Sequence, residues 1–226
     1  MIRRYTSTQD LPATLPLFPL SSVLLLPRAQ IPLNIFEPRY LDMLDASLRE
    51  NRLIGMIQPD GVEAASLQDD PTAKPLLYKV GCVGRITSFN ELSGDRVLIT
   101  LTGVARFRVI QELETTTKFR QGKVDFEEFK DDLTPGEGIE DTSRKRLMSV
   151  LKQYLETHDL HADWDAINNA DDESIVNSLS VISPFGSPEK QALLEAKSLE
   201  DRNQMLVALT EIALAQGDTE ANPKMQ

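Results

Sequence analysis

The alternation of apolar and polar residues predicts a β-rich first half. Short apolar runs between residues 15 and 129 are separated by glycine, proline and asparagine, as strands are by turns. The clearest pattern is a hairpin, in which the segment 78–89 leads to a turn at Gly94-Asp95 and the segment 97–102 returns. Alternate residues of the returning strand share a face: Val97, Ile99 and Leu101 on one side, and Leu98, Thr100 and Thr102 on the other.

Weaker patterns complete the prediction for this half. Short apolar runs predict extended segments at 17–20, 23–26, 54–57, 105–110 and 119–126. One helix is predicted over about 38–50, because Pro38 suits a first helical position and apolar residues recur at helical spacing after it. The polar stretch 60–75 is expected to be a loop, and residues 1–11 a flexible lead.

The second half has the texture of a helical bundle. It follows an expected linker at 127–141, which holds seven acidic residues, one lysine and the breakers Pro135, Gly136 and Gly138. Apolar stripes then predict helices around 147–155, 164–167, 175–179, 188–196 and 205–213, with a capping box at Ser198 to Asp201. We therefore expect an α+β protein with a β-rich lobe at 12–130, a helical lobe at 140–215 and a flexible tail at 216–226.

Composition and charge narrow the function classes. The 226 residues carry 35 Asp and Glu against 24 Lys and Arg, a formal net charge of −11. This charge argues against nucleic acid and anionic membranes as partners. Prolines interrupt the most apolar stretch, so no membrane span or signal peptide is expected. With one cysteine, a disulfide framework is excluded, and we expect a cytoplasmic protein.

Motifs for catalysis or cofactor binding are missing from the sequence. The pair Gly122-Lys123 is followed by Val124 where a phosphate loop needs Ser or Thr, and no Gly-x-Ser-x-Gly elbow exists. His158 and His161 have a spacing that a metal site could use, but a polar helix end explains them as well. Cys82 stands in an apolar strand, as a small buried residue does. We therefore predict no enzyme, no metal and no cofactor.

Five blocks of sequence, in order along the chain, resemble the N-terminal substrate-recognition domain of the Lon protease family. They are LPLFPL at 15–20 with LLP at 25–27, IPLNIFEPRY at 31–40, YKVGCVGRI at 78–86, LTGVARFRV at 101–109, and EKQALLEA at 189–196 with Arg202. The resemblance covers about residues 12–215. The second block looks most like stand-alone bacterial members of the family and the Lon-like domain of cereblon.

The resemblance implies a PUA-like pseudobarrel lobe followed by a helical bundle, as the residue patterns also predict. A full Lon protease carries an ATPase module and a serine–lysine protease module, and neither has a counterpart here. We therefore expect a non-catalytic module that binds exposed apolar segments of unfolded proteins, and that serves as an adaptor to a protease or chaperone. The alternatives are an autonomous peptidase or other hydrolase and an RNA-binding PUA-like protein.

The candidate peptide-binding residues come from two of these blocks. Phe36, Glu37, Arg39 and Tyr40 surround the start of the predicted helix, and Arg106 and Arg108 share a strand face. Each has a structural alternative. Phe36 would pack as a hydrophobic staple, Arg39 would pair with a carboxylate, and Tyr40 would join the core. The two strand arginines would form ion pairs with the acidic surface.

Overall fold

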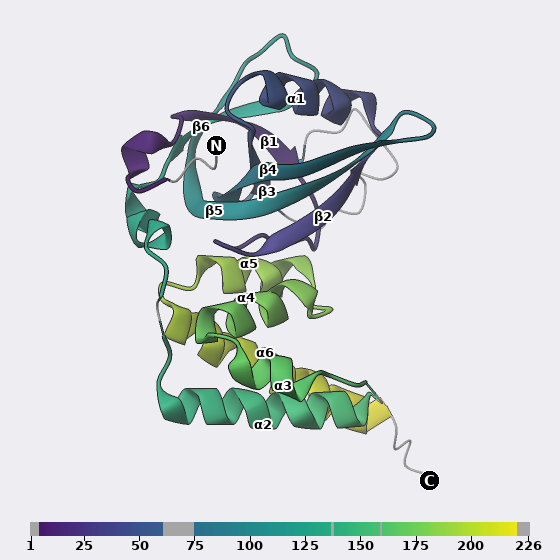
Figure 1. The fold of residues 1–226 in the computed structure, drawn as a ribbon, viewed down its shortest axis with the longest axis vertical. Coiled ribbons are helices and arrows are strands. Elements are labelled where there is room, and N and C mark those ends of the chain that lie inside the picture. The colour runs from purple at the N-terminus through teal and green to yellow at the C-terminus, as the bar shows by residue number, and fades with distance from the viewer. Residues whose placement is uncertain (1–4, 61–74, 137, 159, 221–226) are drawn as a thin grey trace. The chain divides into compact units, whose positions relative to one another are not determined.

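The structure, a computed structural model, describes residues 5–60, 75–136, 138–158 and 160–220 (Figure 1). Its contacts divide the chain into two units. The first unit combines Met1–Pro135 with Phe185–Leu194, and the second combines Gly136–Pro184 with Glu195–Gln226. The first division falls inside the acidic segment 127–141. The segment Phe185–Leu194 differs from the sequence-based division, because it belongs to the β-rich unit although helices surround it in sequence.

Six strands form the sheet of the first unit. They are β1 (Thr14–Pro19), β2 (Gln30–Ile35), β3 (Leu53–Ile57), β4 (Val80–Leu92), β5 (Arg96–Leu113) and β6 (Arg120–Asp125). The strand order is β2-β5-β4-β3-β1-β6, and β5 also pairs with β6. Five strands therefore close into a ring, and β2 attaches to β5 outside it. Among the strands of the described residues, only β1 and β3 pair in parallel. This mixed α+β architecture confirms the predicted fold class.

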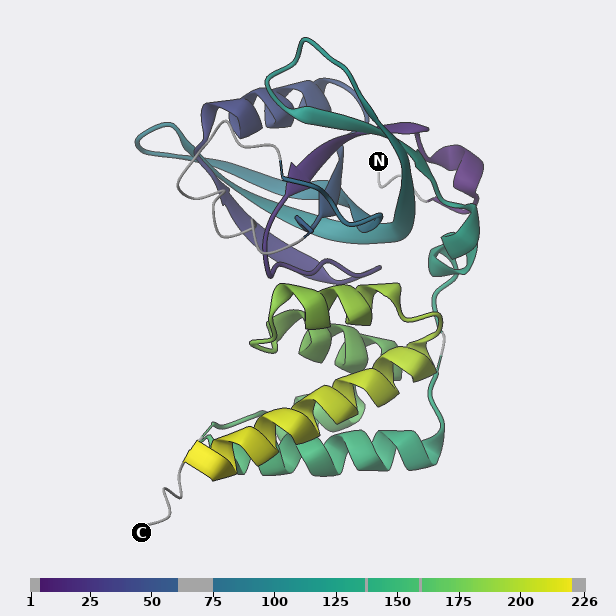
Figure 2. The same cartoon turned by 180° about the vertical axis from the view of Figure 1, so that it is seen from behind.

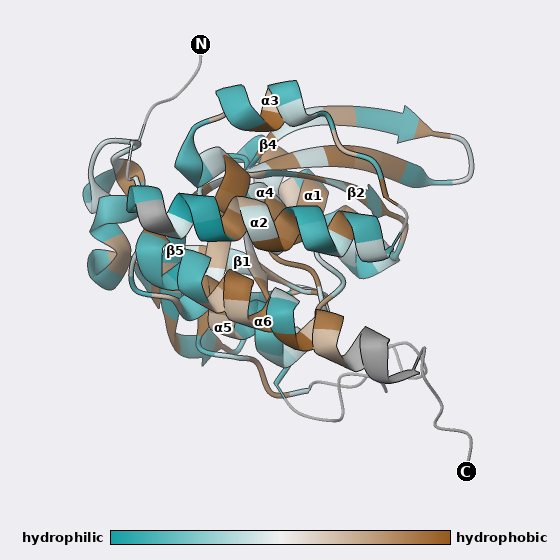
Figure 3. Ribbon diagram, turned by 90° about the horizontal axis from the view of Figure 1, so that it is seen from below, coloured by the Kyte–Doolittle hydropathy of each residue, from teal (hydrophilic) through white to brown (hydrophobic). Residues whose placement is uncertain are grey.

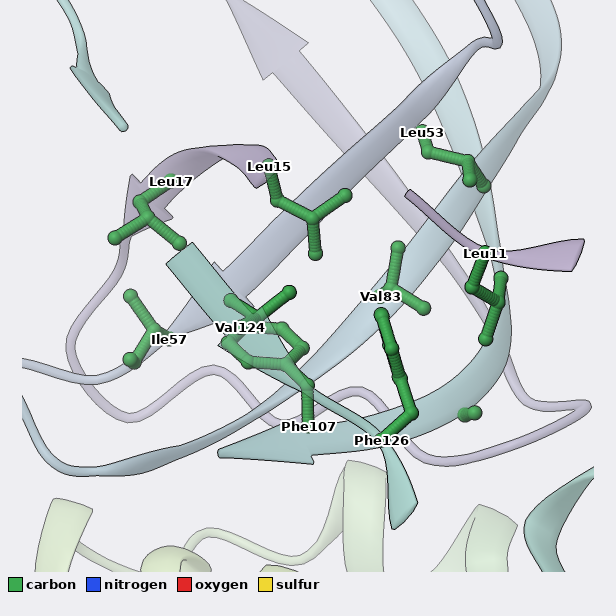
Figure 4. Packing of buried hydrophobic residues seen from close by; sticks show 10 residues of the cluster. Leu11, Leu15, Leu17, Leu53, Ile57, Val83, Phe107, Val124 and Phe126 are labelled. Carbon is green, nitrogen blue, oxygen red and sulfur yellow. The ribbon is translucent and has the colours of Figure 1, made fainter. Parts of the chain in front are cut away.

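Phe107 of β5 lies at the centre of the hydrophobic core inside the ring, together with residues of all five ring strands (Figure 4). The aromatic ring of Phe107 packs against that of Phe126, with 6.2 Å between the two ring centres. Gly81 of β4 makes this packing feasible, since a Cβ there would come within 2.5 Å of the Phe107 ring and of the Met56 carbonyl oxygen. Even an alanine at this position would therefore force the core apart.

The predicted hairpin is present and longer than expected. Gly94 and Asp95 make its turn with positive φ values of 77° and 52°. The pairing of β3 with β4 ends at Leu53 and Arg85, so beyond this point β4 has only β5 beside it, and β5 has β2 on its other side. We call this three-stranded extension the arm: β2, residues 88–92 of β4 and residues 96–100 of β5. Figures 1 and 2 show the hairpin extending past the end of helix α1.

Helix α1 (Pro38–Arg49) follows β2 and begins at proline, as predicted. A proline suits this position because its missing N–H would have no partner in the helix. The helix buries Tyr40, Met43 and Leu44. The Ser47 hydroxyl, also buried, donates to the Met43 carbonyl 2.8 Å away, which gives this buried polar group a partner.

Helix α5 (Ser187–Glu195) is bound to the first unit through buried amide groups. Gln58 donates to the Gln191 side-chain oxygen at 3.1 Å and to the Ser187 carbonyl at 3.2 Å. Gln191 in turn donates to the Val80 carbonyl at 3.1 Å. Buried amides of this kind are costly unless paired, so the network fixes where α5 sits on the β lobe.

The second unit consists of α2 (Asp141–Thr157), α3 (Trp164–Asn169), α4 (Asp172–Ile182) and α6 (Leu199–Glu220). Helix α2 carries both hydrophobic and hydrophilic residues along its length, as Figure 3 shows. The start of α2 lacks a side-chain cap of its own. Carboxylates from other helices replace it, because Glu200 accepts from the Glu140 N–H and the Ser143 hydroxyl, and Asp172 accepts from the Ile139 N–H. The predicted capping box between Ser198 and Asp201 is confirmed by reciprocal hydrogen bonds.

Several predicted segments differ from the structure. The lead is not loose over residues 5–11, because a capped turn at Thr8–Asp10 places Leu11 in the core. The acidic segment is structured at Glu127–Leu133, where a 3-10 helix, η3, buries Phe129 and Asp132. The segment 23–26 forms no strand, although its three leucines are buried, and α6 runs to Glu220, past the expected end at 215.

One predicted loop lies outside the comparison, and one strand of the structure was not predicted. The expected loop at 60–75 lies almost wholly outside the described residues. Strand β2 has no counterpart among the predicted strands, because Pro32 within it weakens a strand pattern. Across the described ranges, no helix has the length and apolar character needed to cross a bilayer.

Candidate functional site

The start of α1 carries a compact charged pair. Arg39 donates through Nε and Nη2 to one Glu37 carboxylate oxygen, at 3.0 and 2.7 Å. Its guanidinium also lies 4.7 Å from the centre of the Tyr40 ring, which packs at 4.5 Å from Phe18. Burial raises the pKa of Tyr40 above its usual 10.0, although the Arg39 charge opposes this effect. The pair is therefore held in one place by a buried tyrosine beneath it.

Phe36, directly before this pair, is 60% exposed. The prediction that it packs as a staple is therefore wrong, whereas the prediction that Tyr40 joins the core is confirmed. Phe36 follows Ile35, which is buried, and Asn34, which is exposed. Continuing this strand alternation by one residue turns Phe36 to the same side as Asn34. An exposed phenylalanine thus stands beside a rigid ion pair.

Two leucines of the hairpin share the face of Asn34. Leu98 pairs with Asn34 on β2 and with Asn90 on β4, and residues paired across a sheet point to the same side. Leu92, two positions after Asn90, points to that side as well. Leu98 is 36% exposed and Leu92 is 43% exposed. We call Phe36, Leu92 and Leu98 the arm face. Large exposed apolar residues that gather on one face are typical of interaction surfaces.

Arg106 lies elsewhere, with only 6% of its surface exposed. It donates to the Asp132 carboxylate from its backbone N–H at 2.8 Å, from Nε at 2.9 Å and from Nη2 at 2.7 Å. Its Nη1 donates to the Leu194 carbonyl at 3.2 Å, and its guanidinium lies 4.7 Å from the Phe129 ring centre. Arg106 therefore ties β5 to η3 and α5, and it cannot face a peptide from the surface.

Arg108 is the exposed member of the strand pair. Its Nε and Nη2 donate to the two carboxylate oxygens of Glu128, at 2.7 and 2.8 Å. These hydrogen bonds lower the pKa of Glu128 below its usual 4.5. The expectation that the strand arginines pair with the acidic surface fits Arg108, whereas Arg106 pairs with Asp132 in the interior.

The structure separates the predicted candidates into two groups. Ile35, next to Phe36, pairs with Val97 at one end of β5, whereas Arg106 and Arg108 stand nine and eleven residues further along this strand. The strand between Val97 and Arg108 covers on the order of 30 Å. The helix-entry residues and the strand arginines therefore do not form one site.

Sequence reasoning missed Leu92, Leu98 and Asp132. A signal existed for Leu98, because its neighbours on the same face, Thr100 and Thr102, are polar and mark that face as solvent-accessible. No local signal relates Asp132 to Arg106, since 26 residues separate them. Two further candidates have structural contacts: Cys82 is buried, and the His158 ring packs at a tilt against the Tyr154 ring. No cluster of three potential metal ligands occurs within the described part of the chain.

Comparison with known proteins gives consistent results. The chain is 28% identical to the Lon protease of Dictyoglomus thermophilum and 27% identical to Lon protease 2 of Myxococcus xanthus, in each case over 89% of this chain. It spans only about a quarter of those proteins, 25% and 24% of their lengths.

Solved structures show the same fold. A Lon N-terminal domain protein from Xanthomonas campestris matches 86% of this chain and 97% of its own, with a TM-score of 0.61 and 23% identity. The N-terminal domain of the Mycobacterium avium complex Lon protease matches 88% and 98%, with a TM-score of 0.62 and 14% identity. The family model of the ATP-dependent protease La (LON) substrate-binding domain matches residues 14–211. The chain therefore belongs to the LON substrate-binding domain family.

Proposed function

We propose that this chain is a non-catalytic module that binds exposed apolar segments of unfolded proteins through the arm face, and that it presents them to a protease or chaperone as an adaptor. The observation that carries the proposal is the exposure of Phe36, Leu92 and Leu98 on one face of the arm. Burying such side chains against a partner would contribute about 1 kcal/mol or more for each well-packed anchor.

The helix-entry residues support the arm face in this proposal. Tyr40 holds Arg39, and Arg39 holds Glu37, so the chain next to Phe36 is rigid before a partner arrives. A rigid surface loses little conformational entropy on binding. The Glu37–Arg39 pair supplies a polar rim beside the apolar side chains, as interaction surfaces commonly have. Arg108, although exposed, stands ten residues along β5 from Leu98 and has no role in this site.

The family supports protein binding over the alternatives. Family membership rests on the substrate-binding domain, so the proposed activity of this chain is recognition without proteolysis. An RNA-binding role is disfavoured by the net charge of −11, which repels phosphate. We also propose that the protein acts in the cytoplasm, where its buried Cys82 would stay reduced.

The test is binding of fluorescein-labelled casein, a protein without a stable fold, measured by fluorescence anisotropy. The double variant Phe36→Ser/Leu98→Ser should bind about tenfold more weakly than the parent. Ile110→Ser is the matched control, because Ile110 is also an exposed apolar residue, at 55%, but stands near Arg108. Equal loss in both variants would contradict the proposed site, and no binding by the parent would contradict the function.

Incubation of the same samples with and without ATP tests the hydrolase alternative. The proposal predicts intact casein on a denaturing gel after prolonged incubation. Cleavage that co-purifies with the parent chain through successive columns would overturn the non-catalytic assignment. The pair variant Glu37→Ala/Arg39→Ala should bind casein less well than the parent while remaining folded, since both side chains are partly exposed.

A further inference from the structure

The arm has two outer edges with different backbone chemistry. In antiparallel strands, successive residues turn their N–H and C=O groups to alternate sides. Gly103 of β5 donates to Ala29 at 2.9 Å, on the side of β2. The backbone N–H and C=O groups of Val97, Ile99 and Leu101 therefore also point toward β2. Those of Leu98 and Thr100 point toward β4. A hydrogen bond from the Thr87 hydroxyl to the Thr100 carbonyl, at 3.2 Å, agrees with this assignment.

The edge formed by β2 is blocked. Pro32 pairs in register with Thr100, whose backbone groups point toward β4. The backbone groups of Pro32 therefore point away from β5, to the outer edge. A proline has no N–H to offer an added strand. Pro32 therefore costs the β2–β5 ladder nothing and at the same time removes a donor from the outer edge. Proline on an edge strand is a known way to prevent further pairing.

The edge formed by β4 carries no proline at residues 87–92, and its one register shift lies at the start of this segment, between Ile86 and Ser88. Asn90 pairs with Leu98, whose backbone groups point toward β4. Phe89 and Glu91, on either side of Asn90, therefore turn their backbone groups outward. Within the described residues, Ile86 is the last residue of β4 with a backbone partner on this side, since its N–H donates to the Arg52 carbonyl at 2.9 Å. Among residues 5–60, 75–136 and the described parts that follow, no strand pairs with β4 beyond Arg85 other than β5.

We propose that the outer edge of β4 at residues 87–92 binds an extended segment of a client polypeptide as an additional strand. This inference rests on the proposed function and assigns a mode of binding to it. Backbone pairing recognises any extended chain, which a module for varied unfolded clients requires. Leu92, the member of the arm face that lies on β4 itself, would then contact side chains on one side of the added segment.

Charge and side-chain chemistry specify the preferred client. Phe89, which is 44% exposed, pairs with Ile99 of β5, and Glu91 pairs with Val97. The side chains of Phe89 and Glu91 therefore lie on the same side of the sheet, two positions apart. Across neighbouring strands, apolar side chains pair favourably with aromatic ones, and charged side chains pair favourably with those of opposite charge. The preferred segment therefore carries an apolar residue and a basic residue two positions apart. The net charge of −11 also favours a basic client over a second copy of this chain.

The test uses a fluorescein-labelled peptide of repeated Thr-Leu-Thr-Lys and two N-methylated forms of it, with binding measured by anisotropy. Leu and Lys would lie beside Phe89 and Glu91 and donate their N–H groups to β4, whereas the Thr N–H groups would point away. Methylation of the Leu and Lys nitrogens should weaken binding about tenfold or more, and methylation of the Thr nitrogens much less. Equal effects of the two methylations would overturn strand addition.

Two variants of the protein make the same comparison. Glu91→Pro removes one outward N–H from β4, as Pro32 does in β2, whereas Glu91→Gln removes only the charge. We expect about tenfold weaker peptide binding for Glu91→Pro and a smaller loss for Glu91→Gln. Circular dichroism and thermal melting establish that each variant is folded. If Glu91→Pro misfolds, the methylated peptides still decide the question.

The remaining outcomes separate this inference from the proposed function. If the parent binds casein, Phe36→Ser/Leu98→Ser loses that binding and Glu91→Pro retains full affinity for the peptide, strand addition is wrong and the function stands. If the parent binds neither casein nor peptide, both are wrong. A dimer that is seen by sedimentation without peptide and is lost in Glu91→Pro would assign the β4 edge to a second copy and overturn the client proposal.

Discussion

The two ends of strand β5 reverse the usual distribution of side chains. In the second half of the strand a charged residue, Arg106, is buried, and near its start an apolar residue, Leu98, is exposed. A buried charge is tolerated only when its hydrogen bonds are satisfied, and Asp132 and the Leu194 carbonyl satisfy those of Arg106. An exposed apolar cluster has no comparable role in the fold. The part of β5 around Arg106 therefore stabilises the unit, and the part around Leu98 is available for binding.

The largest effect is expected from Arg106→Ala. This change leaves the Asp132 carboxylate buried without its partner, which typically costs about 3–5 kcal/mol of unfolding free energy. Urea denaturation followed by circular dichroism would measure it. A loss below about 1 kcal/mol would show that the buried pair does not stabilise the first unit.

A second variant separates the pair from the individual charges. Arg106→Met/Asp132→Leu removes both charges and keeps apolar volume, so it should recover a large part of the stability lost in Arg106→Ala. The Leu194 carbonyl would still lose its donor, so the recovery should be incomplete. A double variant as unstable as Arg106→Ala would indicate that specific geometry, and not the unpaired charge, dominates the cost.

Arg108→Ala should cost less than about 1 kcal/mol, because the Arg108–Glu128 pair is exposed to solvent. The cost should also depend on pH. The pKa of Glu128 is lowered in the folded protein, first by the hydrogen bond from Arg108, so the pair stabilises folding above pH 4.5 and loses its effect as the pH falls through the lowered pKa. Unfolding free energies of parent and variant should therefore converge in acid. A constant difference from pH 7 to pH 3 would contradict this.

The smallest effect on stability is expected at the arm face. Phe36→Ser and Leu98→Ser should each change the unfolding free energy by about 0.5 kcal/mol or less, because the side chains are substantially exposed. The same variants should have the largest effect on casein binding. A loss of stability as large as that of Arg106→Ala would mean that the arm face supports the fold.

Local interactions explain which elements could be predicted from the sequence. The hairpin turn, the start of α1 at Pro38 and the capping box at Ser198 depend on residues within a few positions, and all three are present. Strand β2 was not predictable from its own pattern, because Pro32 is acceptable only on an edge that the sequence alone does not identify.

Contacts between distant residues account for the rest. Asp132 stands in an acidic stretch that has the composition of a linker, and only the position of Arg106 beside it explains its burial. Helix α5 joins the β unit through Gln58, which is 133 residues away from Gln191. At the candidate site, the block 36–40 was found from its resemblance to a family, whereas the exposure of Phe36 depends on where β2 ends.

The central claim is that the arm end of β5 binds clients and the Arg106 end does not. Amide chemical shifts of the isotope-labelled protein, recorded by NMR during titration with an unfolded casein peptide, test it most directly. The account predicts shifts that concentrate at Phe36, at residues 88–92 and at residues 96–100, with little change around Arg106 and Arg108. Shifts that concentrate around Arg108 and Glu128 and leave the arm unchanged would contradict it.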